Sequence, residues 1–213
     1  MNWKLVGLGF VTLVVAALLI TTEQGRSYAK FFTSKIGHFL SSTLNLFPTT
    51  PFEIEAKVTG VVDTKEINID GSTVFLEGMT NSIRVDGREW EISDGRCELE
   101  MKGSGKIVLR GGKVSVDFSA EEVKFLGTRT KNAKIAGELI PLTVNISDGS
   151  VEMINITSAT GSVVKDVEGT EITAEFENKN LEMTNFAGSL ELYGGMLTLK
   201  GTVNMVKIGG REI

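Results

Sequence analysis

Apolar and polar residues follow two different periods in this chain. Residues 5–20 read LVGLGFVTLVVAALLI, sixteen residues without a charge, whereas from Phe52 onward apolar and polar residues alternate in short segments. A helix that crosses a hydrocarbon layer about 30 Å thick needs roughly 20 apolar residues, with about 17 as the lower limit. Counted from Trp3 to Thr22 the first region is long enough, so we expect a transmembrane helix within an anchor at residues 1–22.

Two other interpretations of the apolar run stay open, a cleaved signal peptide and a buried core helix. A short charged segment before an apolar run is typical of a signal peptide, but residues 21–25 (TTEQG) lack a small-x-small cleavage pattern. Arg26, Lys30 and Lys35 favour a cytoplasmic position for the segment after the run. A short anchor before a β-rich domain is instead typical of exported proteins. We expect a single-pass membrane protein with its β domain on the extracytoplasmic side.

The second segment, residues 23–47, has helical periodicity. Its apolar residues recur at intervals of three and four, which places them on one face of a helix. They are Tyr28, Phe31, Phe32, Ile36, Phe39, Leu40, Leu44 and Phe47. This amphipathic helix would lie in the lipid headgroup region or cap the end of the β domain. Pro48 and Pro51 predict a hinge at residues 48–51.

Residues 52–213 have the period of β-strands. Strict alternation is clear at residues 52–58, 97–101 and 114–118. One side of each strand is then apolar and the other is polar, as in antiparallel strands with one wet face. We expect roughly fourteen to sixteen short strands, separated by tight turns.

Glycine pairs supply the predicted turns. Asp-Gly and Gly-Gly tolerate the positive φ angles of two-residue hairpins. These pairs begin at Asp70, Asp86, Asp94, Gly111, Asp148 and Gly194. Gly103-Ser104-Gly105 is also predicted to be a turn between strands, and residues 119–122 are too short to be more than a turn. No helix of ordinary length is expected after Phe52, so the fold class is all-β with an antiparallel, strongly curved meander: a folded-over sheet, a jelly roll or a β-taco.

Composition argues against several classes of function. The formal net charge of −5 disfavours nucleic acid as a partner, because phosphate binding needs a basic field. His38 is the single histidine and Cys97 the single cysteine, so a catalytic pair or a zinc site is not expected. Cys97 shares the apolar phase of Leu99 and Met101 and is predicted to be a core residue. We expect no enzyme, no cofactor and no metal.

The order of these parts resembles that of AsmA/TamB-type membrane proteins. An apolar anchor continues into LLITTEQGRSYAKFF, an amphipathic helix comes next, and the strand EIEAKVTG opens a long meander that ends with NLEMTNFAGSLELYGGMLTLKGTV. LptC, with one anchor and a small folded-over β domain, is similar in size and plan. The resemblance implies a curved sheet whose concave apolar face shields lipid acyl chains.

A lipid-binding or lipid-transfer module is therefore the first functional hypothesis, with membrane lipid as the partner. Its predicted lipid-binding residues are the apolar side chains of one sheet face: Val74, Leu99, Met101, Ile107, Leu109, Val114, Val116, Phe118, Leu190, Leu192, Leu197 and Leu199. A closed hydrophobic core would give the same alternation. The alternative hypothesis is an anchored structural or interaction scaffold that pairs with a protein partner or with itself through edge strands.

Overall fold

The chain divides into two units, residues 1–48 and 49–213. A computed structural model describes residues 50–167 and 169–213, all in the second unit. The predicted anchor at 1–22, the predicted amphipathic or capping helix at 23–47, His38 and the first half of the predicted hinge lie outside the described residues. Within those residues, no helix is long and apolar enough to cross a membrane.

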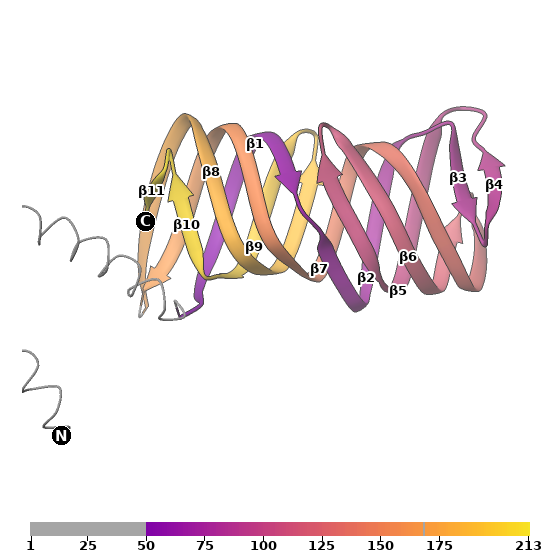
Figure 1. The fold of residues 1–213 in the computed structure, drawn as a ribbon, viewed down its shortest axis with the longest axis horizontal. Helices are drawn as coiled ribbons and strands as arrows, with labels where there is room; N and C mark the ends of the chain where they lie inside the picture. Colours follow the sequence, from indigo (N-terminus) through magenta and orange to yellow (C-terminus); the bar gives the residue numbers. More distant parts are fainter. Residues whose placement is uncertain (1–49, 168) are drawn as a thin grey trace, which may run out of the picture. The chain divides into compact units, whose positions relative to one another are not determined.

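The second unit consists of antiparallel β-strands (Figure 1). Eleven strands are formed by the described residues: β1 (Phe52–Thr64), β2 (Ile67–Met79), β3 (Ser82–Val85), β4 (Arg88–Glu91), β5 (Arg96–Arg110), β6 (Lys113–Phe125), β7 (Thr128–Val167), β8 (Thr170–Tyr193), β9 (Met196–Val203), β10 (Met205–Ile208) and β11 (Arg211–Glu212). The prediction of an all-β, antiparallel and curved sheet is confirmed for this part of the chain.

The 40-residue strand β7 organises the sheet. Along one edge it pairs with β6 and then with β8, and along the other it pairs with β3, β2 and β1. Two closed rings of pairings result, one of β2, β5, β6 and β7 and one of β1, β7, β8 and β9. Because β7 belongs to both rings, the strands wind around one continuous interior (Figure 1). We call this arrangement the roll.

Glycines bend the strands around the interior. Gly103 in β5 and Gly188 in β8 have φ angles of 152° and 154°, and the pairing register shifts close to Gly103. A β-carbon on Gly188 would lie 2.3 Å from the carbonyl oxygen of Lys200, so the close approach of β9 requires glycine there. The expected count of fourteen to sixteen strands was wrong because such bulges bend a strand without ending it. Gly103-Ser104-Gly105, predicted as a turn, lies inside β5 for the same reason.

Five of the six predicted glycine pairs form hairpins or bends, whereas Asp94-Gly95 lies in the connection between β4 and β5, which do not pair with each other. Asp86-Gly87, Gly111-Gly112 and Gly194-Gly195 close two-residue hairpins with positive φ at both residues, as predicted. Asp70-Gly71 and Asp148-Gly149 instead lie inside β2 and β7, where the register shifts. The prediction of hairpins there was wrong, since positive φ suits a bulge as well as a turn. Residues 119–122, predicted to form no more than a turn, belong to β6.

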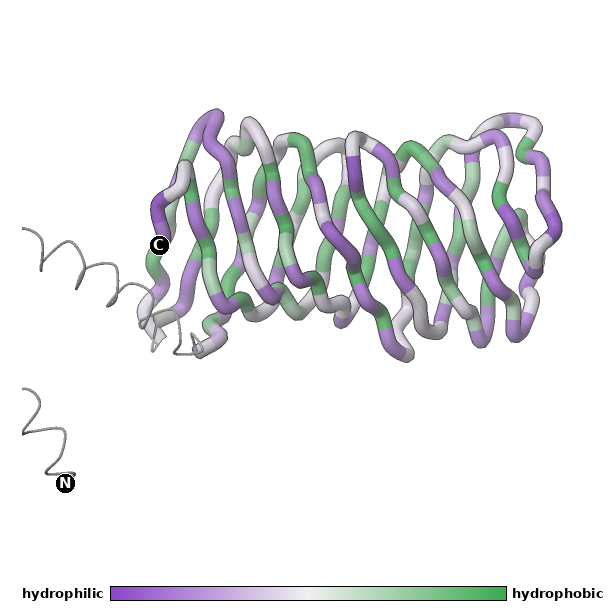
Figure 2. Tube along the Cα trace, viewed as in Figure 1, coloured by the Kyte–Doolittle hydropathy of each residue, from purple (hydrophilic) through white to green (hydrophobic). Residues whose placement is uncertain are grey.

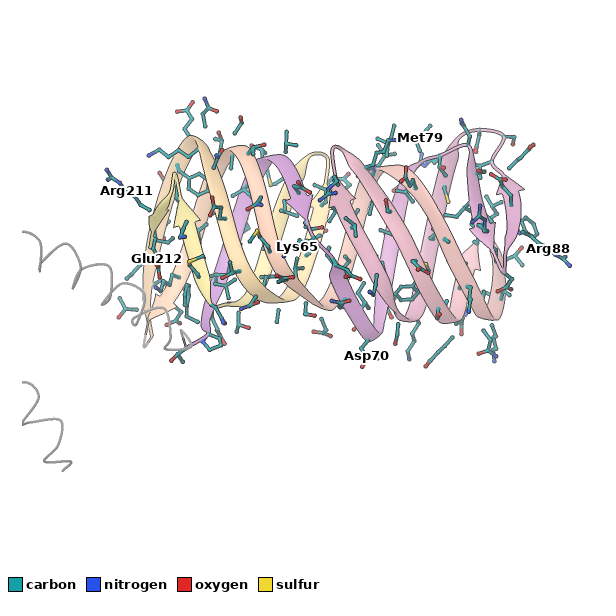
Figure 3. The ribbon with its side chains drawn as sticks, viewed as in Figure 1. Lys65, Asp70, Met79, Arg88, Arg211 and Glu212 are labelled. Carbon is teal, nitrogen blue, oxygen red and sulfur yellow. The ribbon has the colours of Figure 1, made fainter. Side chains whose placement is uncertain are left out.

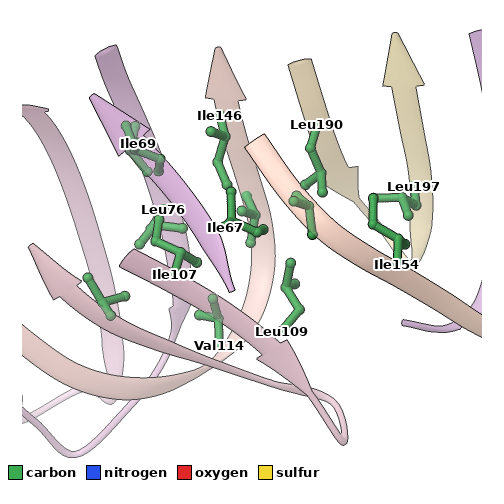
Figure 4. Close-up of a cluster of buried hydrophobic side chains, with 14 of the residues drawn as sticks. Ile67, Ile69, Leu76, Ile107, Leu109, Val114, Ile146, Ile154, Leu190 and Leu197 are labelled. Carbon is green, nitrogen blue, oxygen red and sulfur yellow. The ribbon is translucent and has the colours of Figure 1, made fainter. Parts of the chain in front are cut away.

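Apolar side chains fill the interior of the roll. Green and purple alternate along the strands in Figure 2, and the apolar residues point inward, as the close-up in Figure 4 shows for Ile67, Leu76 and Ile146. Thr64 is the one buried polar residue in the described part of the chain. Its hydroxyl accepts the Leu109 N–H at 3.0 Å and lies 3.4 Å from the Leu109 carbonyl oxygen. Each large buried side chain contributes about 1.5–3 kcal/mol, so this interior is the main source of stability.

Candidate functional site

The twelve predicted lipid-binding residues all belong to strands of the two rings. Eleven of them are at most 4% exposed, and Leu192 is partly buried against the same core. The structure therefore brings the predicted residues together, as Figure 4 shows for Ile107, Leu109 and Leu190. They pack against one another inside closed rings, so an acyl chain would have to open a ring or displace core side chains to reach them.

The hollows on the outer surface are lined largely by polar residues. One lies over β1, β7, β8 and β9 and includes Glu53, Asp166, Glu171 and Lys200. Another lies over β2, β5 and β6 and includes Asp94, Arg96, Glu98 and Lys124. Their lining suits polar or charged partners better than acyl chains.

Reactive side chains are sparse in the described part of the chain. Cys97 is fully buried in the core as predicted, and burial raises the pKa of its thiol to about 11, with Glu98 adding to the rise. A thiol with this pKa stays protonated and is a poor nucleophile at neutral pH. No group of three or more His, Cys, Asp or Glu residues among residues 50–167 and 169–213 is arranged to hold a metal ion.

An open sheet edge distinguishes one half of β8 from the other. Residues 181–193 have β7 on one side and β10 and then β9 on the other. Residues 170–180 pair with β7 alone among the described strands. Asn178 has a positive φ of 49° and the Asn180 carbonyl accepts the Gly209 N–H at 2.7 Å, so the regular open edge ends at residue 177. We call residues 170–177 the edge segment.

The two faces of the edge segment differ in chemistry. Ala174 pairs with Val163 and Phe176 with Gly161, which sets Ile172, Ala174 and Phe176 on the inner face. The alternate residues, including Glu171, Glu175 and Glu177, lie on the outer face and are exposed. This alternation was visible in the sequence, but the missing neighbour was not, because strand pairing is non-local.

The inner face is incompletely covered at the edge segment. Ile172 is 54% exposed although its phase is that of the core. It pairs with Lys165, whose ammonium lies 4.0 Å from the centroid of the Phe52 ring and donates a hydrogen bond to the Ile213 carbonyl at 3.1 Å. This end of the roll therefore combines an exposed apolar side chain with an open backbone edge.

Strands β3 and β4 form a hairpin whose apolar residues pack against the opposite ring. Ile83 is buried next to Gly137, where a β-carbon would lie 3.2 Å from its side chain. Trp90 packs edge-on against Phe125, with 6.3 Å between ring centroids. Strand β4 pairs only with β3 among the described strands, but it has only four residues, all of them classed as exposed. A short, charged edge of this kind is a weak template for pairing.

Exposed apolar side chains also gather on the outer face where the two rings meet. Met79 pairs with Ile140, and Tyr193 pairs with Met196; the Gly194 N–H beside Tyr193 donates to the carbonyl of Leu142 at 3.4 Å. All five of these apolar side chains are more than 40% exposed. Figure 3 shows Met79 directed away from the roll, as are the charged Asp70 and Arg88.

Comparisons with protein-family models, with curated proteins and with solved structures give no significant match for this chain.

Proposed function

We propose that the chain is a non-enzymatic, membrane-anchored interaction scaffold that binds a partner by strand pairing at the edge segment. The observation that carries this proposal is the open edge of β8 at residues 170–177, which pair with β7 alone among the described strands and present an exposed apolar residue, Ile172, beside that edge. At about 3.3 Å per residue, these eight residues offer roughly 26 Å of backbone to an added strand. Added strands gain affinity from main-chain hydrogen bonds and specificity from alternate side chains.

The closed interior supports a scaffold rather than an open lipid groove. Reaching Leu99 or Leu109 through the wall would require two paired strands of the ring of β2, β5, β6 and β7 to separate, which breaks backbone hydrogen bonds inside a low-dielectric core. The rings can instead act as a rigid support that holds the edge segment in an extended conformation. Such preorganisation lowers the entropic cost of binding an extended partner.

Lipid binding or transfer is the second candidate, and the uninterrupted apolar interior favours it. The twelve predicted residues span both rings, and Ile172 exposes an apolar side chain at one end of the same interior. In this proposal the roll opens at the edge segment to admit acyl chains. Under either candidate, residues 1–22 anchor the chain as a single-pass protein with the β domain on the extracytoplasmic side, and neither a cofactor, a metal nor nucleic acid takes part.

Site-specific photo-crosslinking of the full-length chain in its membrane separates these candidates. A photoreactive amino acid at Thr173 reports on the edge segment. The same group at Thr198, on strand β9 between β1 and β8, is the matched control. We expect protein adducts from position 173 and none from position 198. Adducts of lipid mass from an interior position such as Leu99, without protein adducts from position 173, would support the lipid candidate and contradict the scaffold.

A further inference from the structure

We infer that the edge segment accepts an extended segment with alternating basic and apolar side chains, in preference to a second copy of this chain. This inference rests on the proposed function, because it names the kind of partner that fits the same edge. The charge of the outer face, the exposure of the inner face and the spacing of the side chains carry it.

The outer face of the edge segment carries negative charge. Glu171, Glu175 and Glu177 are all exposed, and none of the ion pairs between described residues includes them. Glu171 pairs across the sheet with Asp166, a second carboxylate. Like charges directly opposite each other on a sheet are destabilising. A strand that brings cations alongside would relieve this repulsion.

The neighbouring strands add further negative charge. Glu53 and Glu55 lie on β1, beyond Asp166, and line the same hollow as Glu171. The ammonium of Lys57 is 2.9 Å from Glu55 and lowers the pKa of that carboxyl, with Lys200 adding to the effect. Lys57 is thus already engaged by a carboxylate. Lys200 lines the same hollow but lies on β9, with β7 and β1 between it and Glu171. The uncompensated field next to the open edge is acidic.

A second copy fits this edge poorly. If two edge segments paired antiparallel about Ala174, Glu171 would lie opposite Glu177 and Glu175 opposite Thr173. Other antiparallel registers also bring the outer-face glutamates of the two copies close together, because every charged residue on the outer face of the edge segment is negative. Lys or Arg at alternate positions of a partner strand would instead lie opposite these carboxylates, so three such pairs would strengthen binding by about tenfold.

The inner face of the edge segment determines which side chains the partner strand should direct toward that face. Ile172 is 54% exposed, and Ala174 beside it is partly buried, so apolar surface is available to an added strand. Successive side chains of a strand point to opposite faces. A partner that satisfies both faces therefore alternates basic and apolar residues.

Three synthetic strand peptides of equal length test this inference against the full-length chain in a non-ionic detergent. They alternate Val with Lys, Ser or Glu, and their binding is measured by fluorescence anisotropy at low salt. Hydrogen exchange of residues 170–177 reports whether a bound peptide occupies the edge. We expect the Lys-Val peptide to bind most tightly and to protect this segment, and the Glu-Val peptide to bind most weakly.

Two matched variants test whether peptide binding depends on charge at the edge segment or on the net charge of the protein. Glu175→Lys on the edge segment should weaken binding of the Lys-Val peptide about fivefold and strengthen binding of the Glu-Val peptide. Glu191→Lys changes an exposed glutamate on the same strand and the same face. At this position β8 has β7 on one side and β9 on the other. This control should leave both affinities unchanged. Equal losses in the two variants would overturn the inference.

The remaining outcomes distinguish the inference from the proposed function. If all three peptides protect residues 170–177 equally, the edge binds strands but has no basic preference, and only the inference fails. Dimers that crosslink through Thr173 likewise overturn the inference in favour of a second copy. If no peptide protects the segment and Thr173 gives no protein adduct, both proposals fail.

Discussion

The two halves of β8 differ in their neighbours although one continuous strand forms both. Residues 181–193 lie between β7 and the strands β10 and β9, and their inward residues Leu190 and Met183 are almost fully buried. Residues 170–177 have β7 alone beside them among the described strands, and their inward residue Ile172 is half-exposed. The same alternation of apolar and polar residues therefore occurs in one half that is closed on both sides and in another that has an accessible edge.

Alternation therefore defines the two faces of a strand but not which strands lie beside it. A side chain in the core phase can stay exposed where no second neighbouring strand completes the wall, as Ile172 does, although Phe176 in the same segment is 8% exposed. For function, the closed half provides stability and the open half provides a template for binding. Substitutions in the two halves should therefore separate effects on stability from effects on binding.

Stability should change most when an inner-face side chain is truncated in the closed half of β8, and the same truncation in the open half is its matched control. Leu190→Ala should reduce the free energy of unfolding by about 2–5 kcal/mol, because it leaves a cavity in a packed core. Ile172→Ala should change it by no more than about 0.5 kcal/mol, because this side chain already contacts solvent. Urea denaturation followed by circular dichroism measures both. Similar losses in the two variants would show that the halves do not differ in packing.

Stability should also depend on Gly188, which lies at a bend in the closed half of β8. Gly188→Ala places a β-carbon 2.3 Å from the Lys200 carbonyl at a φ of 154°, so we expect a loss of about 2–3 kcal/mol. Gly194→Ala, in the open β8–β9 hairpin, meets no atom within 4 Å and should cost only about 1 kcal/mol for its positive φ. The same denaturation assay ranks the two variants, and the opposite ranking would contradict the close approach of β9 to β8.

The buried thiol of Cys97 should make stability depend on alkaline pH. Burial raises its pKa to about 11, from an ordinary value near 9, so the folded chain holds a proton that the unfolded chain releases. The free energy of unfolding therefore falls as pH rises from about 9 to 11, and this contribution is fully present below pH 9. Comparison with Cys97→Ala isolates it from other groups. Identical pH profiles for the two proteins would indicate an exposed thiol and an open interior.

The smallest expected effect on stability is at the edge itself. Glu175→Lys exchanges one exposed charge for another and relieves repulsion from Glu171 and Glu177. The free energy of unfolding should therefore change by no more than about 0.5 kcal/mol. Thermal unfolding at low and high salt checks this. A large loss would mean that Glu175 supports the fold, and its effect on peptide binding would then not report on the edge alone.

The sequence predicted the local features of the fold but not its closure. Leu190, Leu197 and Leu199 were placed correctly on one apolar face because alternation is a local property. The length of β7 was missed, because Asp148-Gly149 bends the strand where a hairpin was expected. Ring closure and the free edge depend on which distant segments pair, as when β1 pairs with residues 196–203. Sequence alternation carries no information on that choice, so an open groove and a filled core could not be distinguished.

Hydrogen exchange along β8 measures whether residues 170–177 form an open edge. In the full-length chain alone, amides of residues 170–177 should exchange faster than those of residues 181–193, because only one half has strands on both sides. Adding the Lys-Val peptide should slow exchange in residues 170–177 and leave residues 181–193 unchanged. Equal protection of both halves without peptide, together with no change on its addition, would contradict an open edge that binds a partner strand.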